Sequence, residues 1–357
     1  MISDSKITYM PQLDSLRAFS IFLVLLGHWV QEDVWFKKIP VGTIGVTIFF
    51  VLSGFLISGI LMKNRDSADQ ENKGIFYFLK HFYIRRTLRI FPVYYFTLAV
   101  LYVLNTENIR AVIGWFVLYI SNYYLYFKMD WAGSLSHFWT LAVEEQFYIF
   151  WPLVIFFTPK KHLLKVIYVL ILTGVLFRGF NFLINDRTEY HTMFSYMLTL
   201  SCIDAFSLGA LLAYARNYID KNIDLNKGVY LYVLYGVFLL MIILMFFEIN
   251  VIDVAMSKFC ISVIALFMVS KLSLGAGGIW KLILENKFII YIGKISYGMY
   301  IFHTFIPAIY TALKIPPAKS LIVMFVIYFL MLLIISSVSW YLLEKPINSL
   351  KKKFSYG

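Results

Sequence analysis

The chain has 357 residues, of which 61% are hydrophobic and 15% are charged, with a formal net charge of +12. Soluble globular chains are about 45–50% apolar and about 25% charged, so this composition excludes an ordinary soluble enzyme, a disordered chain and a secreted disulfide scaffold. It predicts an all-α polytopic membrane protein, in which residues 1–357 form one integral membrane domain with no appended soluble domain.

Ten apolar runs are long enough to cross a bilayer, for which a helix needs about 20 mostly apolar residues. They cover residues 13–31, 43–62, 88–104, 138–157, 163–183, 193–215, 228–247, 252–272, 287–310 and 319–343. An eleventh apolar segment, residues 111–127, is interrupted by Asn122 and rich in tyrosine. We expect this segment to be re-entrant or interfacial rather than a full span.

Basic residues at the ends of these runs set the expected sidedness, because Lys and Arg are enriched in cytoplasmic loops. The segments rich in Lys and Arg are residues 63–89, 159–165, 216–227, 271–287 and the tail from Lys351 to Lys353. All of these segments can be cytoplasmic only if residues 104–158 cross the membrane once in total. Segment 111–127 is therefore expected on the external side, and both termini are expected in the cytoplasm. The polar stretch from Lys63 to Lys73 is expected to be a loop. Because the positive charge lies at span ends, we expect membrane lipids around the chain and no nucleic acid partner.

The first apolar run carries three ionisable residues, and each such group costs about 2.5–3.5 kcal/mol at the middle of a membrane helix. Arg17 and His28 are eleven residues apart, which on a helix is three turns plus about 20° and a rise of about 16 Å. Both therefore lie on one helix face. Asp14 has the spacing of a structural partner for Arg17, and His28 could be an interfacial histidine. The spacing alone does not distinguish these structural roles of Asp14 and His28 from catalytic ones.

The second and third runs contain small residues and a cluster of arginines. The segment GTIGVTIFFVLSGFLIS predicts close helix packing, and we interpret Ser53 as a packing residue rather than a nucleophile. Arg85 is interpreted as a positive-inside anchor. Arg86 and Arg89 are one turn apart and face one way, so together they could grip a phosphate group.

Further polar residues lie in the fourth and ninth runs. The segment FWTLAVEEQFY carries Glu144 and Glu145. Two consecutive acids on a helix are not expected to face one cavity, so we interpret one of them as functional and the other as a spectator. In SYGMYIFH, the residues Tyr297, Tyr300 and His303 step by three and lie roughly on one face. Hydrogen bonding between helices is the alternative to a functional role for this trio.

Six of these segments, in this order, resemble the acyltransferase-3 family of integral membrane acyltransferases. They are Arg17-x10-His28, GVTIFFVLSGFL, RRTLRIFP, FWTLAVEEQFY, SYGMYIFH and the terminal EKP. The resemblance covers nearly the whole chain. It implies transfer of an acyl group, usually acetyl, to envelope carbohydrates such as lipopolysaccharide O-antigen, peptidoglycan or exopolysaccharide.

The resemblance implies a role for each matched residue. Arg17 and His28 match the family's signature active-site pair. Arg86 and Arg89 match its Arg-x-x-Arg, which is expected near the phosphates of acyl-CoA. Glu144 matches the acid of the Trp-x-Leu-x-x-Glu motif, and we expect it to orient His28 or to bind the acceptor sugar. The next position varies in the family, so the resemblance implies that Glu145 is the spectator and does not face the cavity.

Other matched positions are expected to support the substrate or the structure. These residues are Asp14, Trp139, Ser296, Tyr297 and His303. One departure concerns the seventh motif, where relatives often carry Arg two residues before an aspartate and this chain has Cys202 before Asp204. A functional role for Asp204 is therefore in doubt. Cys202 and Cys260 lie in apolar runs without zinc-ligand spacing, so we expect no disulfide framework and no metal.

These observations combine into one hypothesis for the reaction, set at the inner membrane of a bacterium. Acetyl-CoA, bound by Arg86 and Arg89 from the cytosol, extends its pantetheine arm toward His28, roughly 20 Å further along the bundle. His28 acts as general base on a hydroxyl of an envelope or lipid-linked glycan. Two alternatives remain at this point. One is a glycosyltransferase that uses a polyprenyl-phosphate sugar, with Glu32 or Asp33 as its external acid, and the other is a glycan exporter without chemistry.

Overall fold

The computed structural model describes residues 9–30, 39–71, 74–185, 188–244, 250–316, 318 and 320–356, and every regular element in these ranges is helical. The helices are α1 (Pro11–Trp29), α2 (Val41–Glu71), α3 (Ile75–Leu104), α4 (Ile113–Val117), α5 (Ser121–Lys128), α6 (Phe138–Phe157), α7 (Lys160–Ile184), α8 (Glu189–Ser195), α9 (Ile203–Tyr218), α10 (Val229–Leu244), α11 (Val251–Leu272), α12 (Gly278–Leu284), α13 (Lys287–Phe302), α14 (Ile306–Ala312), α15 (Leu321–Ser339) and α16 (Lys345–Ser349). The predicted all-α class is confirmed for the described residues.

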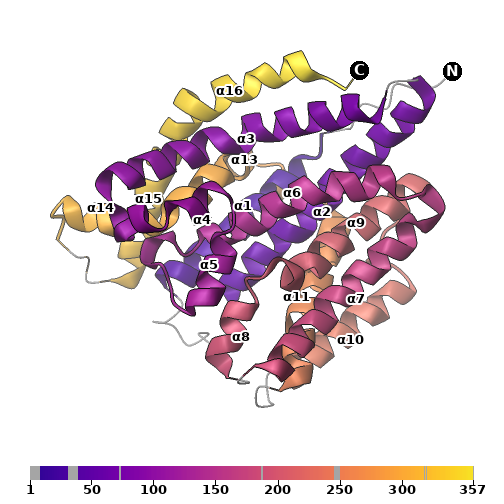
Figure 1. The fold of residues 1–357 in the computed structure, drawn as a ribbon, viewed down its shortest axis with the longest axis horizontal. Coiled ribbons are helices and arrows are strands. Elements are labelled where there is room, and N and C mark those ends of the chain that lie inside the picture. Colours follow the sequence, from indigo (N-terminus) through magenta and orange to yellow (C-terminus); the bar gives the residue numbers. More distant parts are fainter. Residues whose placement is uncertain are drawn as a thin grey trace.

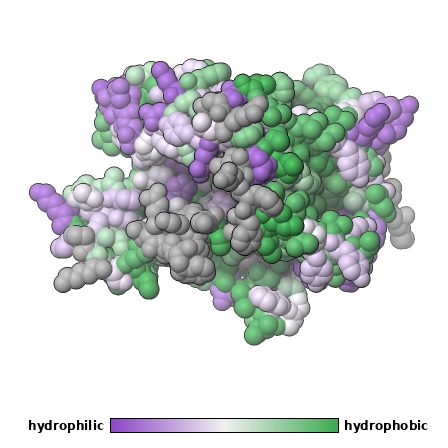
Figure 2. Space-filling model, turned by 90° about the horizontal axis from the view of Figure 1, so that it is seen from below, coloured by the Kyte–Doolittle hydropathy of each residue, from purple (hydrophilic) through white to green (hydrophobic). Residues whose placement is uncertain are grey.

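Within the described ranges, six helices are long and apolar enough to cross a membrane: α2, α3, α6, α7, α11 and α15 with its continuation. A seventh crossing results if α8 and α9, which meet at a bend of 83°, count as one broken span. Figure 2 shows a broad hydrophobic area to the right of the centre of one face, with hydrophilic side chains toward the left and right margins. The count of ten spans and the cytoplasmic placement of both termini stay predictions. Segment 111–127 forms the short helices α4 and α5, neither long enough to cross a bilayer.

The expected continuous span 193–215 is instead broken between α8 and α9. The backbone of Leu198 is extended, and the 3-10 turn η4 (Thr199–Cys202) follows it. Such a break frees carbonyl groups that must be satisfied inside the protein. Lys258 meets this need from α11, because its Nζ donates to the carbonyl of Tyr196 at 2.9 Å.

The expected loop from Lys63 to Lys73 is helical as far as the structure describes it, because α2 continues to Glu71. Polar contacts explain why the helix persists beyond its apolar part. Lys160 Nζ lies 2.6 Å from Asp66 Oδ1 and 2.8 Å from Asp69 Oδ2. Two carboxylates one turn apart thus share one ammonium from the start of α7.

Close helix contacts at glycine hold α2 at the centre of the bundle, as the small residues in its sequence predict. A Cβ on Gly54 would lie 2.1 Å from the carbonyl oxygen of Phe206 in α9, and one on Gly209 would lie 2.1 Å from that of Val51. In the same way, a Cβ on Gly293 of α13 would lie 1.9 Å from the carbonyl oxygen of Asp14 in α1. Helix α2 is therefore held at backbone contact with α9, and α1 with α13, and this fixes three walls of the site described next, α1, α2 and α13.

The C-terminal segment covers α3, and the two run side by side in Figure 1. Arg85 Nη1 donates to the carbonyls of Lys351 and Phe354 at 3.0 and 3.1 Å, and its guanidinium lies 5.0 Å from the ring centroid of Tyr356. Arg85 thus holds the end of the chain against α3.

Candidate active site

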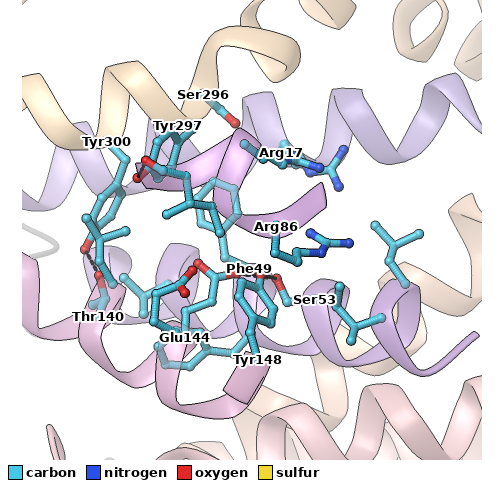
Figure 3. Close-up of a pocket in the computed structure, with 18 of the residues that line it drawn as sticks. Arg17, Phe49, Ser53, Arg86, Thr140, Glu144, Tyr148, Ser296, Tyr297 and Tyr300 are labelled. Atoms are coloured by element: carbon cyan, nitrogen blue, oxygen red, sulfur yellow. Dashed lines mark hydrogen bonds between the residues drawn. The ribbon is translucent and has the colours of Figure 1, made fainter. Parts of the chain in front are cut away.

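Helices α1, α2, α3, α6 and α13 enclose a cavity with an empty volume of about 1050 Å³ including its opening. Figure 3 shows it, with arginines at one end, a carboxylate in the middle and tyrosines at the other end. Its polar lining residues are Arg17, Ser53, Arg86, Arg89, Thr140, Glu144, Glu145, Tyr148, Ser296, Tyr297 and Tyr300. The fold thus brings together most of the residues that the sequence singled out on four separate helices, and adds Ser53, Thr140, Tyr148 and Glu145 to them.

Three guanidinium groups line one end of the cavity. Arg86 lies over the rings of Tyr148 and Phe82, 5.3 and 5.6 Å from their centroids. Within the described ranges, neither Arg86 nor Arg89 forms an ion pair with a carboxylate. Their charge is therefore available to an anion that enters the cavity.

The third guanidinium, that of Arg17, has a partner. Arg17 Nη1 lies 2.5 Å from Asp14 Oδ1, so the structural pair considered from their spacing is present. Tyr9 donates to the other carboxylate oxygen of Asp14 at 2.7 Å. Burial, together with this hydrogen bond, raises the pKa of Tyr9 to about 12. Asp14 thus fixes Arg17 at the cavity wall and is itself held in place.

Glu144 lies in the middle of the cavity and accepts hydrogen bonds from two hydroxyls. Ser53 Oγ donates to Glu144 Oε1 at 2.5 Å, and the hydroxyl of Tyr148 donates to the same oxygen. The same tyrosine hydroxyl lies 3.1 Å from Ser53 Oγ. Ser53 lines the cavity, whereas its neighbour Gly54 makes the close backbone contact with α9.

Both consecutive acids line the cavity, so the expectation that Glu145 turns away from it is wrong. Residues adjacent in a helix point about 100° apart, and the cavity covers more than one face of α6. The Glu145 side chain is 6% exposed, and its Oε1 has no hydrogen-bond partner within the described part of the chain. No sequence signal indicated that this second acid lines the cavity, because that depends on the shape of the cavity.

Helix α13 supplies the far wall. The hydroxyl of Tyr297 donates to the carbonyl of Ile90 in α3 at 2.9 Å, and Ser296 Oγ donates to the carbonyl of Gly293. Tyr300 accepts a hydrogen bond of 2.6 Å from Thr140 Oγ1. Two residues of the predicted late motif thus bond to backbone carbonyls, and Tyr300 joins α13 to α6.

Beyond Tyr300 lies a cluster of three histidines, and the cavity lining stops short of it. The ring centroids of His28 and His303 are 4.7 Å apart, and those of His137 and His303 are 5.0 Å apart. Tyr300 lies 5.4 Å from His303 by the same measure, so it separates the cavity from this cluster. His303 is fully buried, and its Nε2 has no hydrogen-bond partner among the described residues. His28 Nδ1 lies 2.9 Å from the carbonyl of Val24, and Glu144 makes its hydrogen bonds elsewhere.

Trp139 and Asp204 lie away from the cavity. The ring of Trp139 is 5.9 Å from Lys258 Nζ, which also donates to Cys202 Sγ at 3.0 Å. Asp204 forms a bidentate ion pair with Arg178 of α7, with both distances 2.9 Å and both side chains fully buried. Asp204 is therefore neutralised by a guanidinium from another helix, and not by the residue two positions before it, which is Cys202.

Two further expectations concern a metal site and the acids of the loop after the first apolar run. In the ranges that the structure describes, no three His, Cys, Asp or Glu side chains gather in a metal-binding group, and the expected absence of a metal stays a prediction. Glu32 and Asp33, the acids on which the glycosyltransferase alternative depends, lie outside the described residues.

Comparison with known proteins decides the family. Residues 10–341 match the family described as an acyltransferase domain. The chain belongs to this acyltransferase family. The predicted resemblance is thereby confirmed, and the arginine-lined cavity lies wholly within the matched residues of the acyltransferase domain.

Several curated relatives of this chain carry related names. A protein of Staphylococcus aureus strain MSSA476, named as a candidate O-acetyltransferase, is 30% identical over 339 residues, covering 87% of this chain and 53% of the relative. The O-acetyltransferase OatA of S. aureus strain NCTC 8325 is 26% identical over 377 residues, covering 97% of this chain and 58% of OatA. OatA of strain COL gives the same values. The chain thus spans about half the length of these relatives, and no solved structure matches it significantly.

Proposed function

We propose that this protein is a membrane-bound O-acyltransferase that transfers acetyl from acetyl-CoA to a hydroxyl of an envelope polysaccharide. The cavity carries the proposal, because it joins three guanidinium groups at one end to a hydrogen-bonded carboxylate in the middle. An acyl-CoA has a multiply charged phosphate end and a long uncharged arm that ends in the thioester, which suits this distribution of charge. The names of the relatives support the transfer of acetyl to oxygen.

The donor would bind with its phosphates at the arginine end. Arg86 and Arg89 have no competing carboxylate partner among the described residues, and guanidinium groups bind phosphate oxygens with paired hydrogen bonds. If this end faces the cytosol, as the basic residues of the sequence predict, acetyl-CoA enters from the compartment in which it is made.

The acceptor would approach from the histidine end. His28 is the proposed general base, since imidazole exchanges protons near neutral pH. Tyr300 and His303 lie between this base and the cavity, so they would stand where the donor and acceptor paths meet. The proposed acceptor is an envelope glycan or a lipid-linked glycan, for which lipopolysaccharide O-antigen is the first to test, and the proposed location is the inner membrane of a bacterium.

The proposal is tested with purified protein in detergent. Acetyl-CoA binding is measured by calorimetry, and release of free CoA is measured with a thiol reagent, in the presence and absence of acceptor glycans. The variants are His28→Ala and, as a matched control, His162→Ala, whose side chain is exposed at the start of α7. Binding with acceptor-stimulated CoA release in the wild type and in His162→Ala, together with binding but no acceptor-stimulated release in His28→Ala, supports the proposal.

A wild-type protein that neither binds nor cleaves acetyl-CoA under these conditions overturns the proposal. Acceptor-stimulated cleavage of acetyl-CoA that is unaffected by His28→Ala keeps the acyltransferase and removes His28 as its base.

A further inference from the structure

Ser53 has a chemical environment that no other described serine of the cavity shares. Its Oγ lies 2.5 Å from a carboxylate oxygen of Glu144, whereas Ser296, the other serine in the lining, donates to the carbonyl of Gly293. Ser58, on the same helix as Ser53, is fully buried and accepts a hydrogen bond from Trp151 Nε1. A serine paired with a general base inside a ligand-sized cavity is the arrangement of an activated nucleophile.

The surroundings of this pair favour the same chemistry. Arg17, Arg86 and Arg89 line the cavity with Glu144, and positive charge there stabilises both an ionised carboxylate and the negative charge that develops on a thioester oxygen under attack. The hydroxyl of Tyr148 bonds to the same oxygen of Glu144 and lies 3.1 Å from Ser53 Oγ. Tyr148 therefore acts as a positioning residue for the pair.

We propose that Ser53 is an acyl carrier: it takes the acyl group from the thioester donor, with Glu144 as its base, before the group passes to the acceptor. The inference rests on the proposed function and adds a covalent intermediate to it. Ser53 lies in the cavity with the arginines, whereas His28 lies beyond Tyr300, so Ser53 is nearer than His28 to a donor held by the arginines. An acyl-serine divides the reaction into a donor half and an acceptor half, each with its own base.

The donor half-reaction balances as follows. The Ser53 hydroxyl proton moves to Glu144, and Oγ forms a bond to the thioester carbonyl carbon. The bond between that carbon and sulfur then breaks, and the leaving thiolate takes the proton from Glu144, which gives free CoA and an ester on Ser53. In the acceptor half-reaction, a glycan hydroxyl gives its proton to His28 and attacks the ester carbonyl, and Ser53 Oγ leaves and is reprotonated by the imidazolium.

The test traps the intermediate. Purified protein is mixed with radiolabelled acetyl-CoA without acceptor, denatured in acid, and mapped by peptide mass spectrometry, while acetyl-CoA binding is measured on the same samples to show that each variant is folded. The variants are Ser53→Ala, Ser53→Cys, Glu144→Gln and, as matched control, Ser58→Ala. We expect one acetyl group on Ser53 in the wild type and in Ser58→Ala, and loss of the label in Ser53→Ala and Glu144→Gln with binding retained.

The cysteine variant gives a second, positive result. Ser53→Cys should carry a thioester that neutral hydroxylamine removes, whereas the wild-type oxygen ester resists that treatment. Acceptor-dependent transfer that persists in Ser53→Ala, or a label that maps to another residue, overturns the acyl-serine and leaves the proposed function standing. A wild type that does not bind acetyl-CoA overturns both, so the two failures are distinguishable.

Discussion

The imidazole rings of His28 and His303 meet edge to face, with their centroids 4.7 Å apart, although they come from opposite ends of the chain. His28 belongs to α1, and His303 begins the 3-10 turn that ends α13. Helices α1 and α13 contact each other along their length because Gly293 lets the backbones meet at Asp14. The second imidazole therefore borders the proposed base, although nothing in its spacing from His28 could indicate this.

This contact predicts that the two histidines act together. His28→Ala should lower kcat by about 10²–10⁴-fold, the range for loss of a general base, with acetyl-CoA affinity unchanged. Because the rings touch, the effects of His28→Ala and His303→Ala should not add, and their coupling should exceed about 0.5 kcal/mol. Steady-state kinetics of the two single variants and the double variant measure it. Additive losses would mean that His303 acts independently of His28.

The arginines of α3 should divide into two classes. Arg86→Ala and Arg89→Ala remove groups that line the cavity, and each should raise the Michaelis constant for acetyl-CoA about 10-fold or more, since a hydrogen bond to a charged group contributes about 1.5–3 kcal/mol. Arg85→Ala is the control, because its guanidinium bonds to the carbonyls of Lys351 and Phe354. Equal effects at all three positions would argue against a phosphate site.

Asp204 is expected to matter for stability rather than for chemistry. Its ion pair with Arg178 is fully buried, and removing one partner of such a pair costs about 3–5 kcal/mol, because the other charge remains unpaired. Arg178→Met should therefore lower the unfolding midpoint in detergent strongly. The double variant Arg178→Met with Asp204→Leu should recover much of the loss. A double variant less stable than the single one would contradict this account.

Gly293 should not accept a side chain. The Cβ of Gly293→Ala would lie 1.9 Å from the carbonyl oxygen of Asp14, so α13 must move away from α1, at a typical cost of about 1–3 kcal/mol for overpacking. Gly236→Ala in α10 is the matched control, because its Cβ would meet nothing within 4 Å. Alanine there should be neutral or stabilising, since glycine weakens a helix. The midpoint of thermal unfolding and the affinity for acetyl-CoA should both fall in Gly293→Ala, and neither should fall in Gly236→Ala.

Local patterns in the sequence were sufficient for the helices and for some near neighbours. Composition predicted the all-helical membrane character, and the i,i+3 spacing of Asp14 and Arg17 predicted an ion pair that the structure contains. These features depend on residues within a few turns of each other, which periodicity can place. The motifs also led to the correct family. Where such local rules were applied to polar stretches, they failed, because distant partners such as Lys160 keep α2 helical through Asp69.

Only the tertiary structure placed side chains from different helices together. Ser53 and Glu144 meet because α2 and α6 pack against one another, and Asp204 meets Arg178 because α7 and α9 do. Each of these contacts depends on the rotation and depth of two helices relative to each other, which hydropathy does not encode. The sequence alone therefore determined that the chain is an α-helical membrane protein of the acyltransferase family. The packing of α1, α2, α3, α6 and α13 decided which of its polar residues share one cavity.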